Sequence, residues 1–228
     1  MLAERIRPPW IAFSDPDLPV EDRIAAVPEG WQEVLEDAGL FESPASDDVQ
    51  EWWSSIHNVN EAMLDELKAR IGRKGEEATI DYERHRLEKA HRRDLADRIT
   101  WVAEREDRFG FDVASFVVGL LPEMAAEAPL LIEVKASTSK SKERISFDLT
   151  RNEWDVAEMN QDNYLFYFWL GISPDEETDV QEDILGPIIL KSSAIRSRIP
   201  SDSTTELGRW TKCHIELGFD EVSSQMVR

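Results

Sequence analysis

The sequence predicts an α/β or α+β fold around a mixed β-sheet, and two observations carry this prediction. Up to about residue 90, apolar side chains recur near a helical period. From about residue 99 onward, the chain breaks into short apolar, β-branched and aromatic runs separated by polar stretches, the pattern of strands. The resulting order of helices, a series of strands, one more helix and two further strands is typical of a mixed sheet flanked by helices.

Two helices are expected before the sheet. Residues 46–71 keep apolar side chains close to a 3.6-residue period, and Ser46, followed by two acidic residues, is suited to an N-cap. Gly72 and Gly75 then interrupt the pattern. A second helix is therefore expected over residues 76–90.

The strand-forming runs follow one another with one helix between them. Residues 150–153, Thr-Arg-Asn-Glu, have the capping-box pattern and predict a helix that ends near Asn160. Residues 210–215 also alternate like a strand. The expected strands of the sheet are 99–102, 111–118, 129–135, 145–149, 163–172 and 186–190.

Residues 1–70 are expected to form an acidic, tryptophan-rich and mostly helical extension for docking or specificity. Their first 45 residues hold six prolines with aromatic residues between them, so irregular structure with short helices is expected there. Residues 71–228 are expected to form the domain that contains the sheet.

The chain is strongly acidic, with 47 Asp and Glu against 26 Lys and Arg and a net charge of −21. This charge argues against nucleic-acid binding over a broad surface, which depends on basic side chains. The acidity is uneven, because residues 152–183 hold ten acids and no Lys or Arg, whereas residues 71–100 hold eight bases and seven acids. Since charges are screened beyond about 10 Å, a basic cleft is compatible with the overall charge.

The cysteine content and the apolar runs indicate a cytoplasmic protein. Cys213 is the single cysteine, which excludes an internal disulfide and fits a reducing compartment. The N-terminus has no signal-peptide pattern, and the longest apolar runs are too short to span a bilayer. Cys213 and His214 would point to opposite faces of a strand, so a catalytic pair between them is not expected.

Charged residues interrupt the apolar run over residues 129–135, which otherwise resembles a central strand. Side chains alternate along a strand, so Glu133 and Lys135 share one face and Val134 lies on the other. Buried charges are costly unless they are paired or bind a metal ion. An ion pair between Glu133 and Lys135 on an exposed sheet face is the alternative interpretation.

A second acid, Asp112, begins the preceding strand, and a hairpin would bring it beside Glu133. Two neighbouring carboxylates repel each other unless a cation lies between them, and oxygen ligands favour Mg²⁺ or Mn²⁺. Lys135, two residues further on, would then lie beside a metal-bound water. A metal ion, a charged group and an oriented water are what phosphodiester hydrolysis requires.

An acid followed some twenty residues later by Glu-x-Lys resembles the PD-(D/E)XK nuclease superfamily, and a closer resemblance covers roughly residues 68–195. There the chain is similar to the NO VEIN C-terminal domain family, which is counted among the PD-(D/E)XK folds. The blocks that carry this resemblance are Gly72–Glu77 (GRKGEE), Tyr82–Glu83, Leu87, Gly110–Phe116 (GFDVASF), Ile132–Lys135 (IEVK), Phe147, Leu149–Glu153 (LTRNE) and Tyr164–Tyr167 (YLFY). The chain departs from the family near His91, where a glycine is common.

The resemblance implies a restriction-endonuclease-like fold and a metal-dependent active site. Asp112 and Glu133 would bind Mg²⁺ or Mn²⁺ together with the Val134 carbonyl, and Lys135 would position or polarise the attacking water. Glu76 matches an acidic position that touches the metal site in many such nucleases. Its alternative role is that of an acid near a helix N-terminus.

Glu153 also matches a family position, and its place in the capping box favours a structural role. A nucleic-acid-binding role is expected for a set of polar residues that follow the Glu-x-Lys strand, with a solvated surface of mixed charge as the alternative. This set is Lys140, Lys142, Arg144, Arg151 and Asn152. The second basic cluster, Arg84, Arg86, Arg92, Arg93 and Arg98, is better explained as such a solvated surface.

The function expected on these grounds is that of a magnesium-dependent DNA endonuclease in bacterial restriction or anti-phage defence, the setting in which the family often occurs. Its partners would be DNA, a helicase or other defence subunit bound through the acidic N-terminal region, and a second copy of the chain in a homodimer. One alternative is a non-catalytic subunit whose acidic surface binds a protein or mimics DNA. Another is a nuclease that acts on RNA.

Overall fold

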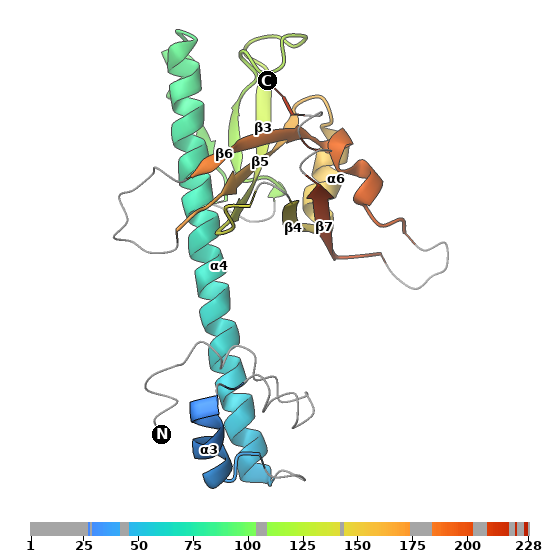
Figure 1. Cartoon of the computed structure of the whole chain (residues 1–228). Coiled ribbons are helices and arrows are strands. Elements are labelled where there is room, and N and C mark those ends of the chain that lie inside the picture. The colour runs from blue at the N-terminus through green and yellow to red at the C-terminus, as the bar shows by residue number, and fades with distance from the viewer. Residues whose placement is uncertain are drawn as a thin grey trace. The chain divides into compact units, whose positions relative to one another are not determined.

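The computed structural model confirms the predicted α+β fold (Figure 1). It describes residues 27, 29–41, 46–103, 109–141, 144–173, 184–202, 209–218, 222, 226 and 227, with the backbone only at residues 29 and 53–64. The chain divides into two compact units, Met1–Ala69 and Arg70–Arg228, and each is described by itself. None of the described helices combines the length and apolar character that crossing a membrane requires.

In the first unit, helix α3 (Glu29–Asp37) and the start of helix α4 (Asp47–Lys89) enclose a small apolar core. The Ser46 hydroxyl accepts the Val49 N–H at 3.4 Å, which confirms the predicted N-cap. Of the segment 1–45, residues 1–26, 28 and 42–45 lie outside the described residues. The core consists of Val27, Leu35, Leu40 and Val49, with Trp31, Phe41 and Trp52 packed against it.

Helix α4 is continuous, so the prediction of two helices separated at Gly72 and Gly75 is wrong. Both glycines have helical surroundings, and a side chain at Gly72 would meet nothing within 4 Å. A Cβ at Gly75 would lie only 2.6 Å from the Cβ of Ala136 and 3.3 Å from Val134. Gly75 therefore serves close packing of α4 on the sheet and does not end the helix.

These two glycines predict opposite effects of the same substitution. Gly75→Ala is expected to lower the free energy of unfolding by about 2 kcal/mol, because the new methyl group overlaps a packed strand. Gly72→Ala, the matched control in the same helix, is expected to raise it by about 0.5–1 kcal/mol through helix propensity. Urea denaturation of the two variants measures both effects, and equal shifts in one direction would contradict the packing of α4 on the sheet.

Helix α4 ends in a left-handed residue, His91, with φ of 59°. The N–H of Arg92 donates to the Leu87 carbonyl and the N–H of His91 to the Glu88 carbonyl, both at 2.9 Å. This hydrogen-bond pattern is a Schellman motif, whose left-handed position favours glycine. The departure expected near His91 thus falls at a helix C-cap, which this chain forms with histidine in the left-handed position.

The central sheet has the strand order β1-β2-β3-β5-β6. Strand β2 is antiparallel to both of its neighbours, β1 and β3. Strand β5 lies parallel to β3 and β6 is antiparallel to β5, so the sheet is mixed as predicted. Each strand overlaps a segment expected from the sequence. Their bounds are β1 Thr100–Trp101, β2 Val113–Phe116, β3 Pro129–Ser137, β5 Tyr164–Leu170 and β6 Leu185–Lys191.

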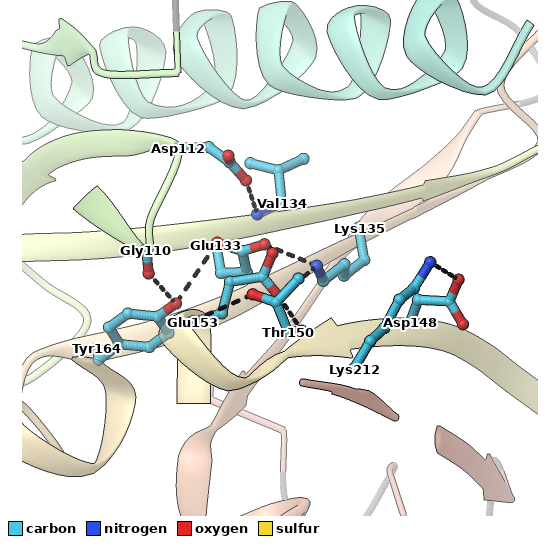
Figure 2. Close-up of polar contacts among 10 residues, drawn as sticks. All are labelled: Gly110, Asp112, Glu133, Val134, Lys135, Asp148, Thr150, Glu153, Tyr164 and Lys212. Atoms are coloured by element: carbon cyan, nitrogen blue, oxygen red, sulfur yellow. Dashed lines mark hydrogen bonds and ion pairs between the residues drawn. The ribbon is translucent and has the colours of Figure 1, made fainter. Parts of the chain in front are cut away.

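A second sheet pairs β4 (Arg144–Thr150) with β7 (Lys212–Gly218), and helix α6 (Arg151–Met159) follows β4 directly. The inward side chains of β4, β5, β6, β7 and α6 form an extensive apolar core, the largest described, which includes Phe147, Trp154, Phe166 and Ile215. Figure 2 shows that α4 and β4 lie on opposite sides of β3. Three short helices, α5 (Arg93–Ala96), η4 (Ser192–Ala194) and η5 (Arg196–Arg198), complete the described elements.

A buried polar cluster joins α4 to the sheet on the face away from β4. The Glu83 carboxylate is fully buried and accepts bonds from Arg86 at 2.6 and 2.9 Å, from the Ser115 hydroxyl at 2.5 Å and from the Tyr167 hydroxyl at 2.9 Å. Arg86 also donates to the carbonyls of Phe116, at 2.6 Å, and Val118. The cluster fixes the rotation of α4 over β2 and β5, because each partner sits on a different element.

Candidate functional site

Strand β3 carries the centre of the candidate site and shows the alternation predicted from the sequence. Val134 contacts the position of Gly75 on α4, whereas Glu133 points to the opposite side. Glu133 is only 2% exposed, although it is charged in its ordinary state. The alternative of an exposed ion pair between Glu133 and Lys135 is therefore wrong, because both side chains are buried or nearly so.

Asp112 lies beside β3, as the predicted hairpin requires. Its N–H donates to the Ile132 carbonyl at 2.9 Å, and its own carbonyl accepts the N–H groups of Val102 and Ala103 at 2.8 and 3.1 Å. Its carboxylate accepts the Val134 N–H at 2.7 Å. The contact with Val134 is thus made through the N–H of that residue, while the predicted contact to a cation would use its carbonyl.

The ammonium of Lys135 lies between two carboxylates (Figure 2). Its Nζ is 2.7 Å from Oε1 of Glu133 and 3.1 Å from Oε2 of Glu153. The Lys135 side chain is 16% exposed, and that of Glu153 is 19% exposed. Lys135 is therefore a largely buried cation with two anionic partners from different elements, β3 and α6.

Glu153 has two roles, of which the sequence indicated one. The predicted capping box of α6 is present: Oε2 of Glu153 accepts the Thr150 N–H at 2.8 Å, and the Thr150 hydroxyl accepts the Glu153 N–H at 3.3 Å. The same oxygen contacts Lys135. The capping-box pattern located this carboxylate at the start of α6, but nothing in it indicated that the start of α6 faces β3.

Tyr164 is a member of the site that sequence reasoning missed. It begins β5, is fully buried, and its hydroxyl donates to the Gly110 carbonyl at 2.8 Å and lies 3.5 Å from Oε2 of Glu133. The parallel pairing of β3 with β5 explains this position, because it sets Leu131 opposite Tyr164. Its place in the YLFY block was the available signal, but the apolar neighbours favoured a core role.

Asp112, Glu133 and Glu153 border a cavity of about 720 Å³, whereas Lys135 and Tyr164 are not among its lining residues. Three carboxylates, those of Asp112, Glu133 and Glu153, lie in its wall together with the Asn152 side chain and the Phe111 ring. The remaining lining residues are Ala103, Gly110 and Thr150. The cavity combines acidic groups, an amide and an aromatic surface in a space large enough for part of a nucleotide.

Burial dominates the electrostatics of the site. Burial raises the pKa of Asp112 to about 7. The hydrogen bond from the Val134 N–H lowers this pKa, and the negative charge of Glu76 raises it. Burial likewise raises the pKa of Glu133, with the Lys135 charge acting in the opposite direction. Burial alone would lower the pKa of Lys135, but the carboxylates of Glu133 and Glu153 outweigh it and raise that pKa, so the ammonium is charged at neutral pH.

The donor chemistry of Asp112 and Glu133 fits a hard divalent cation. Both carboxylates line one cavity, Glu133 is buried and Asp112 partly so, and desolvation makes the negative charge of each costly, a cost that a cation would relieve. Among the residues that the structure describes, no three acidic, histidine or cysteine side chains converge on one point as metal ligands. Asp112 and Glu133 are the residues whose carboxylates would hold such a cation, with main-chain or water oxygens in its other positions.

Glu76 lies on α4 and accepts a hydrogen bond from the indole N–H of Trp101. Its negative charge contributes to the raised pKa of Asp112. The continuous α4 removes its alternative role as an acid at a helix N-terminus, because the helix begins 29 residues earlier at Asp47.

The predicted nucleic-acid-binding residues are only partly brought to the cavity. Asn152 lines it. Arg151 is paired with Asp155 at 2.8 Å and Asp202 at 2.7 Å and lies over the Trp210 ring, and Arg144 is paired with Glu216 at 3.3 Å. Lys140 is exposed, and Lys142 lies outside the described residues.

Two further sequence interpretations can be compared with the structure. Of the second basic cluster, Arg86 is not part of a solvated face, because it is buried against Glu83. On β7, Cys213 packs against the largest apolar core while the neighbouring His214 bonds Asp148 at 3.0 Å on the exposed face. The expectation that Cys213 and His214 form no catalytic pair agrees with this alternation.

Comparison with known proteins gives one match. Residues 75–179 match the sequence model of the family described as Protein NO VEIN, C-terminal. No curated protein and no solved structure matches the chain. The matched segment runs from Gly75 through β5, so it includes every side chain of the candidate site. Over residues 75–179 the chain is therefore similar to the NO VEIN C-terminal family, the resemblance that its sequence blocks predicted.

Proposed function

We propose that this chain is a metal-dependent endonuclease that hydrolyses DNA phosphodiester bonds. The observation that carries the proposal is a single cavity lined by two carboxylates, the partly buried Asp112 and the buried Glu133, with the Lys135 ammonium 2.7 Å from Glu133. A buried excess of acid beside a lysine is costly for the fold, and such sites are characteristic of catalysis or metal binding. The family match supports the same proposal through the resemblance of these residues to the PD-(D/E)XK pattern.

In this proposal, Asp112 and Glu133 hold Mg²⁺, which Mn²⁺ could replace. The cation would supply an activated water and positive charge near the phosphate. Lys135 remains protonated at neutral pH, so it does not take a proton from water. Its ammonium orients the nucleophile and stabilises the negative charge that develops on the phosphate oxygens. Asn152 can donate a hydrogen bond to the substrate from the cavity wall.

The biological setting that we propose is restriction or anti-phage defence in the cytoplasm. Residues 1–70 would bind a helicase or another defence subunit, because an acidic surface suits a basic protein better than DNA. A homodimer would allow both strands of a duplex to be cut. Asp112, Glu133 and Lys135 would act in the same way on RNA, so RNA is the second substrate to test.

A non-catalytic subunit is the alternative that one observation favours. The net charge is −21, and the two arginines expected to bind nucleic acid, Arg144 and Arg151, are both paired with carboxylates. An acidic scaffold that binds a protein or mimics DNA would have these properties. The cost of desolvating the carboxylates of both Asp112 and Glu133 at one cavity is what a pure scaffold would leave unexplained.

The proposal predicts metal-dependent cutting that depends on Lys135. The purified chain is incubated with plasmid, single-stranded DNA and RNA in Mg²⁺, Mn²⁺ or EDTA. Lys135→Ala and Asp112→Ala are each expected to lower the cutting rate at least 100-fold, because the first removes a positive charge that acts on the reacting phosphate and the second removes a ligand of the cation. Lys191→Ala, which removes an exposed ammonium on β6, is the matched control and keeps full activity.

Circular dichroism of each variant shows whether it is folded. Cutting that persists in folded Lys135→Ala would contradict the assignment of the site. If no nucleic acid is cut and calorimetry detects no binding of Mn²⁺, the scaffold function replaces the nuclease.

A further inference from the structure

The Lys135 ammonium and a bound cation would compete for the same carboxylate. Glu133 is the closest partner of Lys135, at 2.7 Å, and it is also one of the two carboxylates proposed to hold the cation. A largely buried lysine that loses its one anionic partner is strongly destabilised. Binding of a cation through Glu133 therefore requires a second anion for Lys135.

Glu153 meets this requirement. Its Oε2 lies 3.1 Å from the Lys135 ammonium, on a different element from Glu133. The same oxygen accepts the Thr150 N–H, which ties the carboxylate to the N-cap of α6. The N-cap is held in turn, because the Arg151 N–H donates to the Thr211 carbonyl at 2.8 Å and β4 pairs with β7. The second anion is thus fixed in place before any ligand binds.

We propose that Glu153 is a positioning residue that holds the Lys135 ammonium at the cavity and leaves Glu133 available to the cation. This inference rests on the proposed metal-dependent function. The Glu153 carboxylate then has two roles. A neutral side chain can also cap α6, whereas balancing the positive charge of Lys135 needs a negative charge. Glutamine replaces glutamate in capping boxes, so the two roles can be tested separately.

The test is Mn²⁺ binding to the full chain, measured by calorimetry. Glu153→Gln keeps the cap and removes the charge, so we expect the melting temperature without metal to change little and the affinity for Mn²⁺ to fall about tenfold. Asp155→Asn removes the same charge from the same helix at a residue paired with Arg151, and it is expected to leave the affinity within twofold of the unsubstituted chain.

Repeating the measurement in the Lys135→Met variant distinguishes positioning of Lys135 from direct attraction between Glu153 and the cation. In Lys135→Met there is no ammonium to hold, so adding Glu153→Gln is expected to change the Mn²⁺ affinity less than twofold. An equal loss of affinity in both backgrounds would show that Glu153 acts on the cation directly and would overturn the inference.

The remaining outcomes are also decisive. If Glu153→Gln binds Mn²⁺ as tightly as the unsubstituted chain, Glu153 only caps α6 and the inference fails while the proposed function stands. If the unsubstituted chain binds no Mn²⁺, the proposed function fails and the inference fails with it.

Discussion

Glu83→Ala is expected to lower the free energy of unfolding by about 3–5 kcal/mol, the cost of breaking a buried ion pair. The substitution leaves the Arg86 guanidinium, which is 13% exposed, without its carboxylate. It also removes the acceptor of the Ser115 and Tyr167 hydroxyls, and buried donors without acceptors are costly. Chemical denaturation monitored by tryptophan fluorescence measures the loss.

Glu88→Ala is the matched control, because Glu88 is an exposed glutamate near the end of the same helix, and its effect is expected within about 0.5 kcal/mol. The double variant Glu83→Leu/Arg86→Met removes both charges and is expected to recover part of the lost stability. A Glu83→Ala variant as stable as Glu88→Ala would mean that the cluster does not join α4 to the sheet.

Asp112→Asn is expected to stabilise the protein at pH 8 by about 2 kcal/mol while abolishing the proposed activity. Burial raises the pKa of Asp112 in the folded protein to about 7, well above the ordinary value of 3.8. From about pH 4 to pH 7, the unfolded chain gives up a proton that the folded protein retains, so stability falls as pH rises through this range. Asparagine carries no charge, and its carbonyl can still accept the Val134 N–H.

The measurement is the free energy of unfolding in EDTA at pH 4 and at pH 8 for both proteins. The unsubstituted chain should lose more stability over this interval than Asp112→Asn, and the residual slope should reflect Glu133, whose pKa is also raised. Mg²⁺ should raise the melting temperature of the unsubstituted chain at pH 8 and leave that of Asp112→Asn unchanged. Equal pH dependence of the two proteins would contradict the burial of a charged Asp112.

Much of the fold could be predicted because the relevant signals are local. Alternation along residues 129–135 gave the faces of β3, and the capping box placed the start of α6. The break between two helices was predicted wrongly, because glycine in a helical pattern has two explanations and the sequence does not separate them. Only the contact of Gly75 with Ala136, from a strand about 60 residues away, shows that packing is the reason.

The site could be predicted only in part, because some of its side chains are brought together by contacts between segments that are distant in the sequence. Asp112, Glu133 and Lys135 have a recognisable spacing, so the sequence located them. Glu153 and Tyr164 reach the site through long-range pairing, since β5 lies parallel to β3 and α6 spans the connection between them. The ion pair between Arg151 and Asp202 could not be predicted from the sequence either, because the two residues are 51 positions apart.

The pairing of β4 with β7 bears on how this domain is delimited. The family match ends at residue 179, yet β6 and β7 lie beyond that limit and supply Ile188, Leu190, Ile215 and Leu217 to the largest core. A fragment cut at the limits of the match would leave β5 and β4 each with an unpaired edge and expose that core. It would also remove Thr211, the acceptor of the Arg151 N–H beside the cap that holds Glu153. Expression work on this chain should therefore keep the segment through Gly218, because the carboxylates of the site depend on a strand that the family boundary omits.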